Sequence, residues 1–165
     1  MTIFDTVREL VQNYCTNDPF ELCECLGVKV KVTSIGQSKG LYTYVADVPV
    51  IIISDKLRRS ERIIVCSHEL GHHVLHAEVA ANDALRGFSF YNMRDKTEYE
   101  ANIFMADLLI DDEELDGLFI GGSTIEEASA MLRLPSDIVR LKMEDMNRRG
   151  WSYDIPMGSA CLFGR

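Results

Sequence analysis

Apolar residues at the start of the chain recur with the period of a helix. Residues 2–15 carry them at spacings of i, i+3, i+4 and i+7, which predicts an amphipathic helix. A short second helix is expected from Pro19 to about Gly27. Asp18 suits its N-cap, proline suits the first helical position, and glycine suits the residue just beyond the end.

The period then changes to that of a strand. Residues 28–33 alternate valine with lysine or threonine, which predicts a half-buried strand. Residues 41–45 and 48–53 predict a hairpin, and the apolar run from Val50 predicts that its second strand lies inside the sheet. Three strands in series favour a small, mainly antiparallel sheet.

Helical periodicity returns in the middle of the chain. A helix is expected over residues 61–77, with Ser60 as its N-cap. Another is expected over about residues 94–110, where the apolar residues again share one face. The turn-forming residues between them predict that segment 78–93 is irregular.

A glycine pair at 121–122 separates two further predicted helices from the rest. One opens at Ser123, with Glu126 at the capping-box position, and the other runs from Pro135 to Arg148. The two resemble a helix-turn-helix in outline, but the segment is acidic and lacks the basic face that DNA reading requires. Packing helices or a partner-docking surface are favoured, and no direct binding to nucleic acid is expected.

Composition narrows the location and the partners. The 165-residue chain has a formal net charge of −9, which argues against non-specific binding to nucleic acid or anionic lipid. The sequence has no run of about 18 apolar residues that would predict a membrane span. Because the N-terminus lacks the basic and apolar regions of a signal peptide, a cytoplasmic location is expected. The five cysteines are irregularly spaced and are interpreted as reduced thiols rather than as a metal site.

The most informative stretch is His68-Glu69-Leu70-Gly71-His72, an H-E-x-x-H motif. On a helix, His68 and His72 lie one turn apart on the same face, where both imidazoles can bind one Zn²⁺ ion. Glu69 lies beside them and is a candidate general base toward a water molecule at the metal. A hydrolytic zinc site is therefore the leading interpretation of this stretch.

A catalytic zinc site needs a third protein ligand and leaves a fourth position for water. The candidates are His73, His76, Glu98 and Glu100. His73 is rotated by about 100° from His72 around a helix, and His76 lies about 12 Å from His68 along a straight helix. We therefore expect neither to bind the metal, and we expect His76 to support the site or the end of the helix.

Glu98 is the predicted third ligand. It shares one helical face with Asn102 at i+4, whereas Glu100 points about 200° away, so the two glutamates cannot both face the metal. The Asn102 amide can accept an imidazole N–H and fix the orientation of that ring. With His68 and His72, Glu98 would complete a His₂Glu set, which is the arrangement of zinc peptidases.

Two longer stretches resemble the ImmA/IrrE metallopeptidase family. They are His68–His76 and Glu98–Phe104, the second followed by Leu108-Leu109. The upstream order of strand, hairpin and helix is also similar, including Gly40-Leu41-Tyr42, and the resemblance covers roughly residues 5–115. It implies that His68, His72 and Glu98 are zinc ligands, that Glu69 is the general base, and that Asn102 is a supporting polar residue.

The resemblance also implies a biological setting. Members of the family are cytosolic zinc proteins, often encoded by phages and mobile elements, that cleave or help inactivate a helix-turn-helix repressor. The implied partner is therefore a protein substrate, a DNA-binding repressor.

The elements together predict an α+β fold. Residues 1–118 are expected to form a zincin-like metallopeptidase domain, in which the small sheet packs on the H-E-x-x-H helix and on a second ligand-bearing helix. Residues 119–165 are expected to form a C-terminal helical extension and tail.

Three functions are compatible with this sequence. The first is a zinc metalloprotease. The second is a zinc-containing regulatory module that engages a repressor or antitoxin without proteolysis. The third is a metal-free transcription factor that uses residues 123–147.

Overall fold

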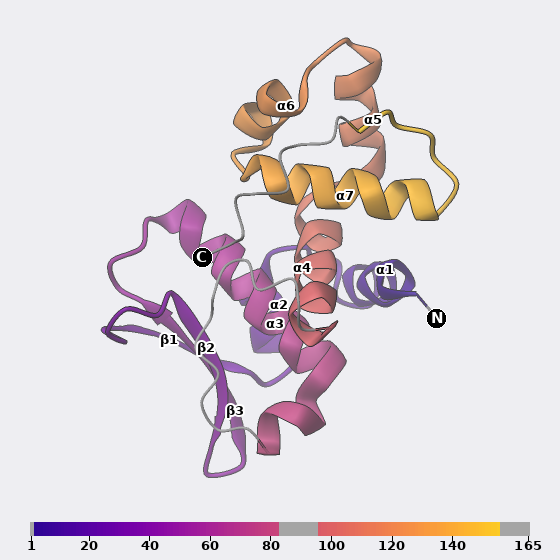
Figure 1. Ribbon diagram of the computed structural model, residues 1–165. Coiled ribbons are helices and arrows are strands. Elements are labelled where there is room, and N and C mark those ends of the chain that lie inside the picture. Colours follow the sequence, from indigo (N-terminus) through magenta and orange to yellow (C-terminus); the bar gives the residue numbers. More distant parts are fainter. Residues whose placement is uncertain (1, 83–95, 156–165) are drawn as a thin grey trace. The chain divides into compact units, whose positions relative to one another are not determined.

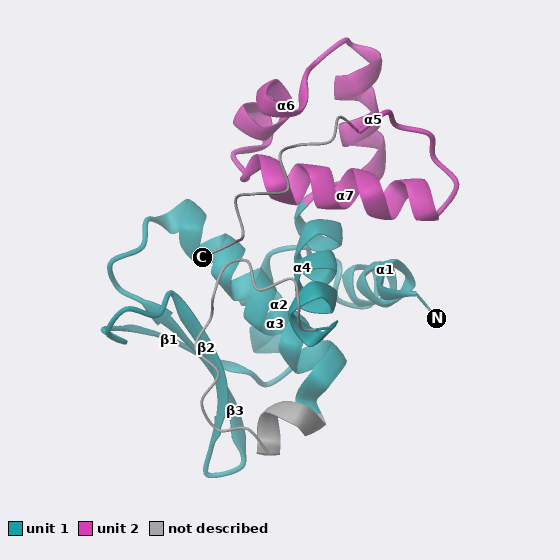
Figure 2. Cartoon of the chain, in the orientation of Figure 1, with its two compact units in different colours: residues 1–109 teal, residues 110–165 magenta. Residues whose placement is uncertain are grey.

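The computed structural model describes residues 2–82 and 96–155 of the chain (Figure 1). Its elements in chain order are α1 (Ile3–Tyr14), α2 (Pro19–Cys25), β1 (Lys29–Thr33), β2 (Gly40–Val45), β3 (Val48–Ser54), α3 (Arg59–Asn82), α4 (Lys96–Leu109), α5 (Asp112–Ile120), α6 (Ile125–Leu132) and α7 (Ser136–Arg148). The predicted α+β class is confirmed. The chain divides into two compact units, Met1–Leu109 and Ile110–Arg165 (Figure 2).

The first two helices begin where their capping residues predict. At the start of α1, the Thr2 side chain accepts a hydrogen bond from the Asp5 backbone N–H, and the Asp5 carboxylate accepts one from the Thr2 backbone. Asp18 accepts hydrogen bonds from the Phe20 and Glu21 backbone N–H groups at the start of α2. The prediction for Asp18 is thus confirmed.

The sheet has the strand order β1-β3-β2 and is mixed. β3 pairs antiparallel with β2, as the hairpin predicts, but pairs parallel with β1. The expectation of a mainly antiparallel sheet is therefore wrong in this detail, because the chain after β1 crosses to the far side of β3 before it forms the hairpin. β3 is the central strand as predicted, and its Ile51 and Ile53 side chains are completely buried.

Helix α3 is the central element of the first unit. One side of it packs on β2 and β3, and α4 packs against it as well (Figure 1). α2 contacts both α3 and β1, and α1 contacts α4. The core between these elements contains Leu22, Ile51, Val65, Leu70 and Phe104, all completely buried.

The bounds of α3 differ from the prediction at both ends. The helix begins at Arg59, so Ser60 lies inside it rather than at the cap. The Glu61 carboxylate accepts the Arg58 backbone N–H at this end instead. The helix extends to Asn82, past the predicted end, and the remaining part of the expected irregular segment, 83–93, lies outside the described residues.

The second unit contains α5, α6 and α7. α6 has a capping box as predicted, but it is formed by Thr124 and Glu127, one residue further along than the expected Ser123 and Glu126. In the described part of the chain, no helix combines the length and apolar character needed to cross a membrane.

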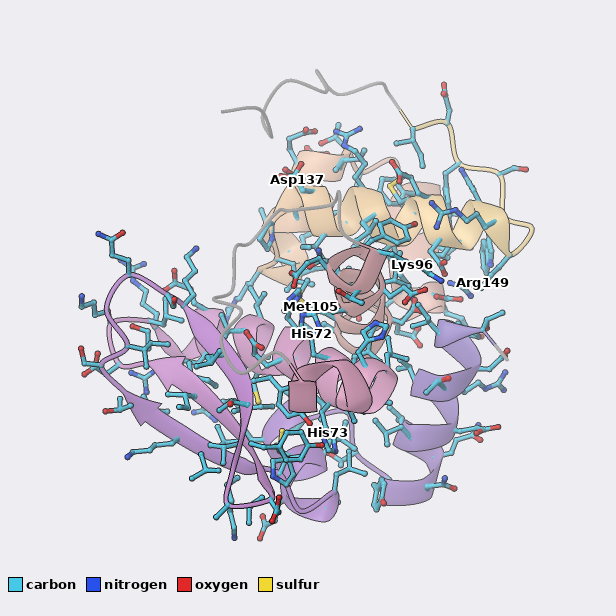
Figure 3. All side chains as sticks on the ribbon, turned by 60° about the horizontal axis from the view of Figure 1, so that its bottom comes forward. His72, His73, Lys96, Met105, Asp137 and Arg149 are labelled. Atoms are coloured by element: carbon cyan, nitrogen blue, oxygen red, sulfur yellow. The ribbon has the colours of Figure 1, made fainter. Side chains whose placement is uncertain are left out.

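A charged network ties α5 to α7 within the second unit. The Lys142 side chain is 1% exposed, and its Nζ lies 2.7 Å from the Asp112 carboxylate. Arg149, at the end of α7 (Figure 3), donates to both Asp112 and Asp145. Burial raises the pKa of Asp112, but the hydrogen bonds from Arg149 and Lys142 outweigh it and leave the pKa below its usual value.

We predict that Asp112→Asn destabilises the second unit by about 3 kcal/mol at neutral pH, because the buried Lys142 and the neighbouring Arg149 both lose a carboxylate contact. Since the pKa of Asp112 is lower in the folded protein than in the unfolded chain, this contribution is complete above about pH 4 and is lost as the pH falls through the folded-state value. The difference between variant and wild type should therefore shrink below that pH.

Urea unfolding followed by the fluorescence of Trp151, the single tryptophan of the chain, measures this effect. Glu113→Gln removes a charge from the same first turn, at an exposed position, and serves as the control. Equal stability of Asp112→Asn and Glu113→Gln at pH 7 would show that the network does not stabilise the unit.

Candidate metal centre

The two motif histidines lie on the buried part of α3. His68 is completely buried and Glu69 is 3% exposed, while the neighbouring Cys66 and Leu70 are completely buried. His68 and His72 point from one face toward α4, with ring centroids 4.8 Å apart. The helical prediction for the motif is confirmed by this segment of α3.

Gly71, inside the motif, allows the backbones of α3 and α4 to approach closely. A Cβ atom at this position would lie 3.2 Å from the Ala101 Cα, 3.2 Å from the Ala101 carbonyl oxygen and 3.2 Å from the Phe104 Cβ. Because two of these three atoms belong to the backbone, a larger residue would push the helices apart. The spacing between the histidine helix and α4 is thus set by a glycine.

Three side chains from the two helices converge at this approach. His68 Nε2 lies 3.1 Å from His72 Nε2, His68 Nε2 lies 3.3 Å from one Glu98 carboxylate oxygen, and His72 Nε2 lies 3.2 Å from the other. Their donor atoms form a group that could hold a metal ion. The structure therefore brings together His68, His72 and Glu98, which the sequence selected as metal ligands.

The contact of His68 Nδ1 with Asn102 indicates which ring nitrogen of His68 carries the proton. His68 Nδ1 lies 3.0 Å from the Asn102 Oδ1, and Asn102 is 2% exposed. With the amide in this orientation its oxygen can only accept, so Nδ1 carries the proton and Nε2 presents a lone pair. Burial is the main cause that lowers the pKa of His68, which keeps the ring neutral.

This donor set fits a metal ion. The His68 lone pair faces a second imidazole nitrogen and a carboxylate, an arrangement that is satisfied by a cation. Ligands about 2.0–2.1 Å from a tetrahedral zinc ion are separated by about 3.3 Å, close to the three distances here. Two imidazoles and a carboxylate are donors that suit zinc.

The two glutamates of the site have opposite electrostatic environments. Burial raises the pKa of Glu98, but the contacts with the imidazoles of His68 and His72 outweigh it and lower the pKa to about 2. Glu98 is therefore a carboxylate at neutral pH. Burial raises the pKa of Glu69 well above its usual value, the negative charge of Glu98 raises it further, and a hydrogen bond from the Tyr42 backbone opposes both.

Strand β2 lies directly against Glu69. A Cβ atom on Gly40 would lie 2.7 Å from the Glu69 Oε1 and 2.4 Å from the Val65 Cγ1. Only glycine permits this approach of the strand to the carboxylate. Glu69, the residue after His68, is thus held against the sheet.

The remaining histidines point elsewhere. His73 Nδ1 lies 2.7 Å from the Tyr42 hydroxyl, and Figure 3 shows His72 and His73 leaving α3 in different directions. His76 Nε2 lies 3.2 Å from the Glu100 carboxylate, and the ring centroids of His72 and His76 are 6.1 Å apart. His76 thus lies near His72, but it pairs with Glu100 and not with the predicted ligand Glu98.

His76 does not lie on a straight helix, so the expectation of a straight helix up to His76 is wrong. The backbone of His76 is not helical, with φ of −139° and ψ of 29°, so α3 is kinked at this residue. Gly40, Gly71 and Tyr42 were not among the predicted site residues. The only signal for Gly71 in the sequence was a glycine inside a helical pattern, which often marks a close packing contact.

The comparisons with known proteins agree with the geometry. Residues 23–144, well over half of the chain, match the model of the IrrE N-terminal-like domain, a peptidase family. The chain is 31% identical over 137 residues to immunity region protein 2 of Bacillus phage phi105, covering 82% of this chain and 85% of that protein. It is 26% identical over 160 residues to the metallopeptidase ImmA of Bacillus subtilis (strain 168), covering 90% of each.

We predict that Gly71→Ala lowers the free energy of unfolding by about 1–3 kcal/mol, because the added methyl group contacts the α4 backbone. Gly117→Ala, inside α5, is the matched control, since no heavy atom lies within 4 Å of the new Cβ in the described part of the chain. Alanine should there stabilise the helix by up to about 1 kcal/mol. Chemical denaturation of both variants measures the two signs, and a stabilising Gly71→Ala would contradict the close approach.

Proposed function

The chain belongs to the IrrE N-terminal-like family of metallopeptidases, and on that premise we propose that it is a zinc-dependent enzyme that hydrolyses a peptide bond in a protein substrate. His68, His72 and Glu98 would hold the zinc ion, and Glu69 would be the general base. The observation that carries this proposal is the set of distances of 3.1–3.3 Å that join the Nε2 atoms of His68 and His72 to each other and to the Glu98 carboxylate. Glu69, the residue after His68, is buried.

A zinc ion bound there would supply Lewis acidity, which polarises a substrate carbonyl and lowers the pKa of water. Glu69 would take the proton from the attacking water molecule and deliver it to the leaving amine. Burial and the charge of Glu98 raise its pKa, so Glu69 holds a proton more readily than an exposed glutamate does, which suits the delivery of that proton to the leaving amine. Glu98, with its lowered pKa, is suited to remain an anionic ligand.

Asn102 would support the metal ligands without touching the substrate. Its amide oxygen accepts the His68 Nδ1–H, which fixes the ring orientation and leaves Nε2 for the metal. The burial of His68 and Glu69 would limit competing water around the reacting atoms, which strengthens every electrostatic interaction in the site.

The proposed substrate is a DNA-binding repressor of a phage or mobile element. Support comes from the relatives, one named as a phage immunity region protein and one as the metallopeptidase ImmA. Proteolysis is favoured over repressor binding alone because Glu69, the residue after His68, is buried and within the electrostatic influence of Glu98, whereas a purely structural metal site needs no general base.

We predict that Glu69→Gln lowers kcat for peptide hydrolysis by about 10²–10⁴-fold, because the amide cannot accept the proton. Zinc content should remain unchanged, since Glu69 is not a ligand. Glu61→Gln, an equivalent change at the start of the same helix, should retain full activity. Hydrolysis measured on fluorescence-quenched peptides, together with zinc analysis, tests both roles. Wild-type activity in Glu69→Gln would contradict the assignment of the base.

We further predict that Glu98→Ala lowers zinc affinity by at least about 10²-fold, whereas Glu100→Ala changes it little. The two glutamates lie on the same helix, but Glu98 faces both donor histidines and Glu100 pairs with His76 and Lys96. Metal competition titrations with a chromophoric chelator measure both affinities. Full zinc affinity in Glu98→Ala would remove Glu98 from the ligand set, and absence of zinc binding in the wild type would favour a metal-free regulator.

A further inference from the structure

Glu69, the general base of the proposed mechanism, lies on α3, and its side chain packs against strand β2. Gly40 of β2 leaves room for the Glu69 carboxyl group, because a Cβ atom there would lie 2.7 Å from the Glu69 Oε1. The position of Glu69 therefore depends on where β2 lies relative to α3.

β2 has only one strand neighbour. It pairs with β3 on one side, and in the described part of the chain no strand pairs with its other side. A ladder on one side fixes the register of a strand but leaves its free side to be positioned by other contacts. Side-chain contacts with α3 must therefore set the distance between this part of β2 and the helix.

The Tyr42 side chain makes such a contact. Tyr42 is 6% exposed, and its hydroxyl lies 2.7 Å from His73 Nδ1, within hydrogen-bond distance. The two rings also meet edge to face, with centroids 5.4 Å apart and an interplanar angle of 75°. β2 thus meets Glu69 at Gly40 and contacts α3 through the Tyr42 side chain, two residues further along the strand.

His73 has no part in the donor group. It leaves α3 in a different direction from His72, and its Nδ1 is engaged by Tyr42 (Figure 3). The second of two consecutive histidines therefore faces the strand, whereas the first faces the metal donors.

We propose that Tyr42 and His73 form a positioning pair, whose hydrogen bond holds β2 against α3 and thereby keeps the Glu69 carboxyl group in its working orientation. This inference rests on the proposed role of Glu69 as the general base. Neither residue touches the substrate or the metal; both act through Glu69.

Two variants break the hydrogen bond from opposite sides. Tyr42→Phe keeps the ring and its edge contact but removes the hydroxyl, and His73→Phe removes the ring nitrogen that the hydroxyl meets. Tyr14→Phe, at a 40% exposed position on α1, is the matched control and should behave as the wild type.

The first readout needs neither zinc nor substrate. In the metal-free protein, the exchange rates of the β2 backbone amides report on how firmly this strand is held. NMR should show these rates rising at least about tenfold in both variants, with amides in the middle of α1 unchanged. Unchanged exchange rates in β2 would overturn the proposal.

The second readout uses the zinc-loaded protein and the best-cleaved member of a mixture of fluorescence-quenched decapeptides. Each variant should lower kcat about tenfold while KM and zinc affinity stay within about twofold, because only the transition-state interaction is lost. The double variant should lose no more than either single one. A parallel fall in zinc affinity, or additive losses in the double variant, would show a general structural role and overturn the proposal.

The two readouts also separate this inference from the proposed function. If wild-type protein with zinc cleaves none of the decapeptides, the proposed function fails, and the amide exchange rates alone then decide the pairing. Faster exchange in both variants would support the Tyr42–His73 contact as the device that holds β2 on Glu69. Cleavage by the wild type with unchanged exchange would leave the enzyme assignment standing and reject the positioning pair.

Discussion

The close approach of α3 and α4 at Gly71 is the constraint on which the site depends. The three donor atoms come from two different helices, so their separations of 3.1–3.3 Å follow from the distance between the helix backbones. A single methyl group at Gly71 would contact the backbone of Ala101 and increase that distance. The glycine therefore links the packing of the core to the geometry of the site.

The same two helices and the adjacent strand also give two glutamates opposite properties. Glu98 lies between two imidazoles, which lower its pKa to about 2. Glu69 is buried against β2, and this burial, together with the negative charge of Glu98, raises its pKa. One carboxyl group is thus suited to bind a cation and the other to exchange a proton, and the difference arises from their surroundings alone.

The helical periodicity of the sequence was sufficient to select the converging residues. Each helix contributes two residues one helical turn apart, His68 and His72 on α3 and Glu98 and Asn102 on α4. Residues at this spacing lie on the same face of any regular helix. The kink at His76 and the parallel pairing of β1 with β3 were not predictable in this way, because they depend on contacts between distant segments. The roles of Gly40 and Tyr42 were missed for the same reason: a sequence does not show which strand lies against a helix.

The central claim is that one zinc ion is held by His68, His72 and Glu98. X-ray absorption spectroscopy at the zinc edge, on protein loaded with one equivalent of zinc, tests it most directly. The expected result is a four-coordinate site with nitrogen and oxygen ligands at about 2.0–2.1 Å and the outer-shell scattering of two imidazoles. A sulfur shell at about 2.3 Å, or the signal of only one imidazole, would contradict it.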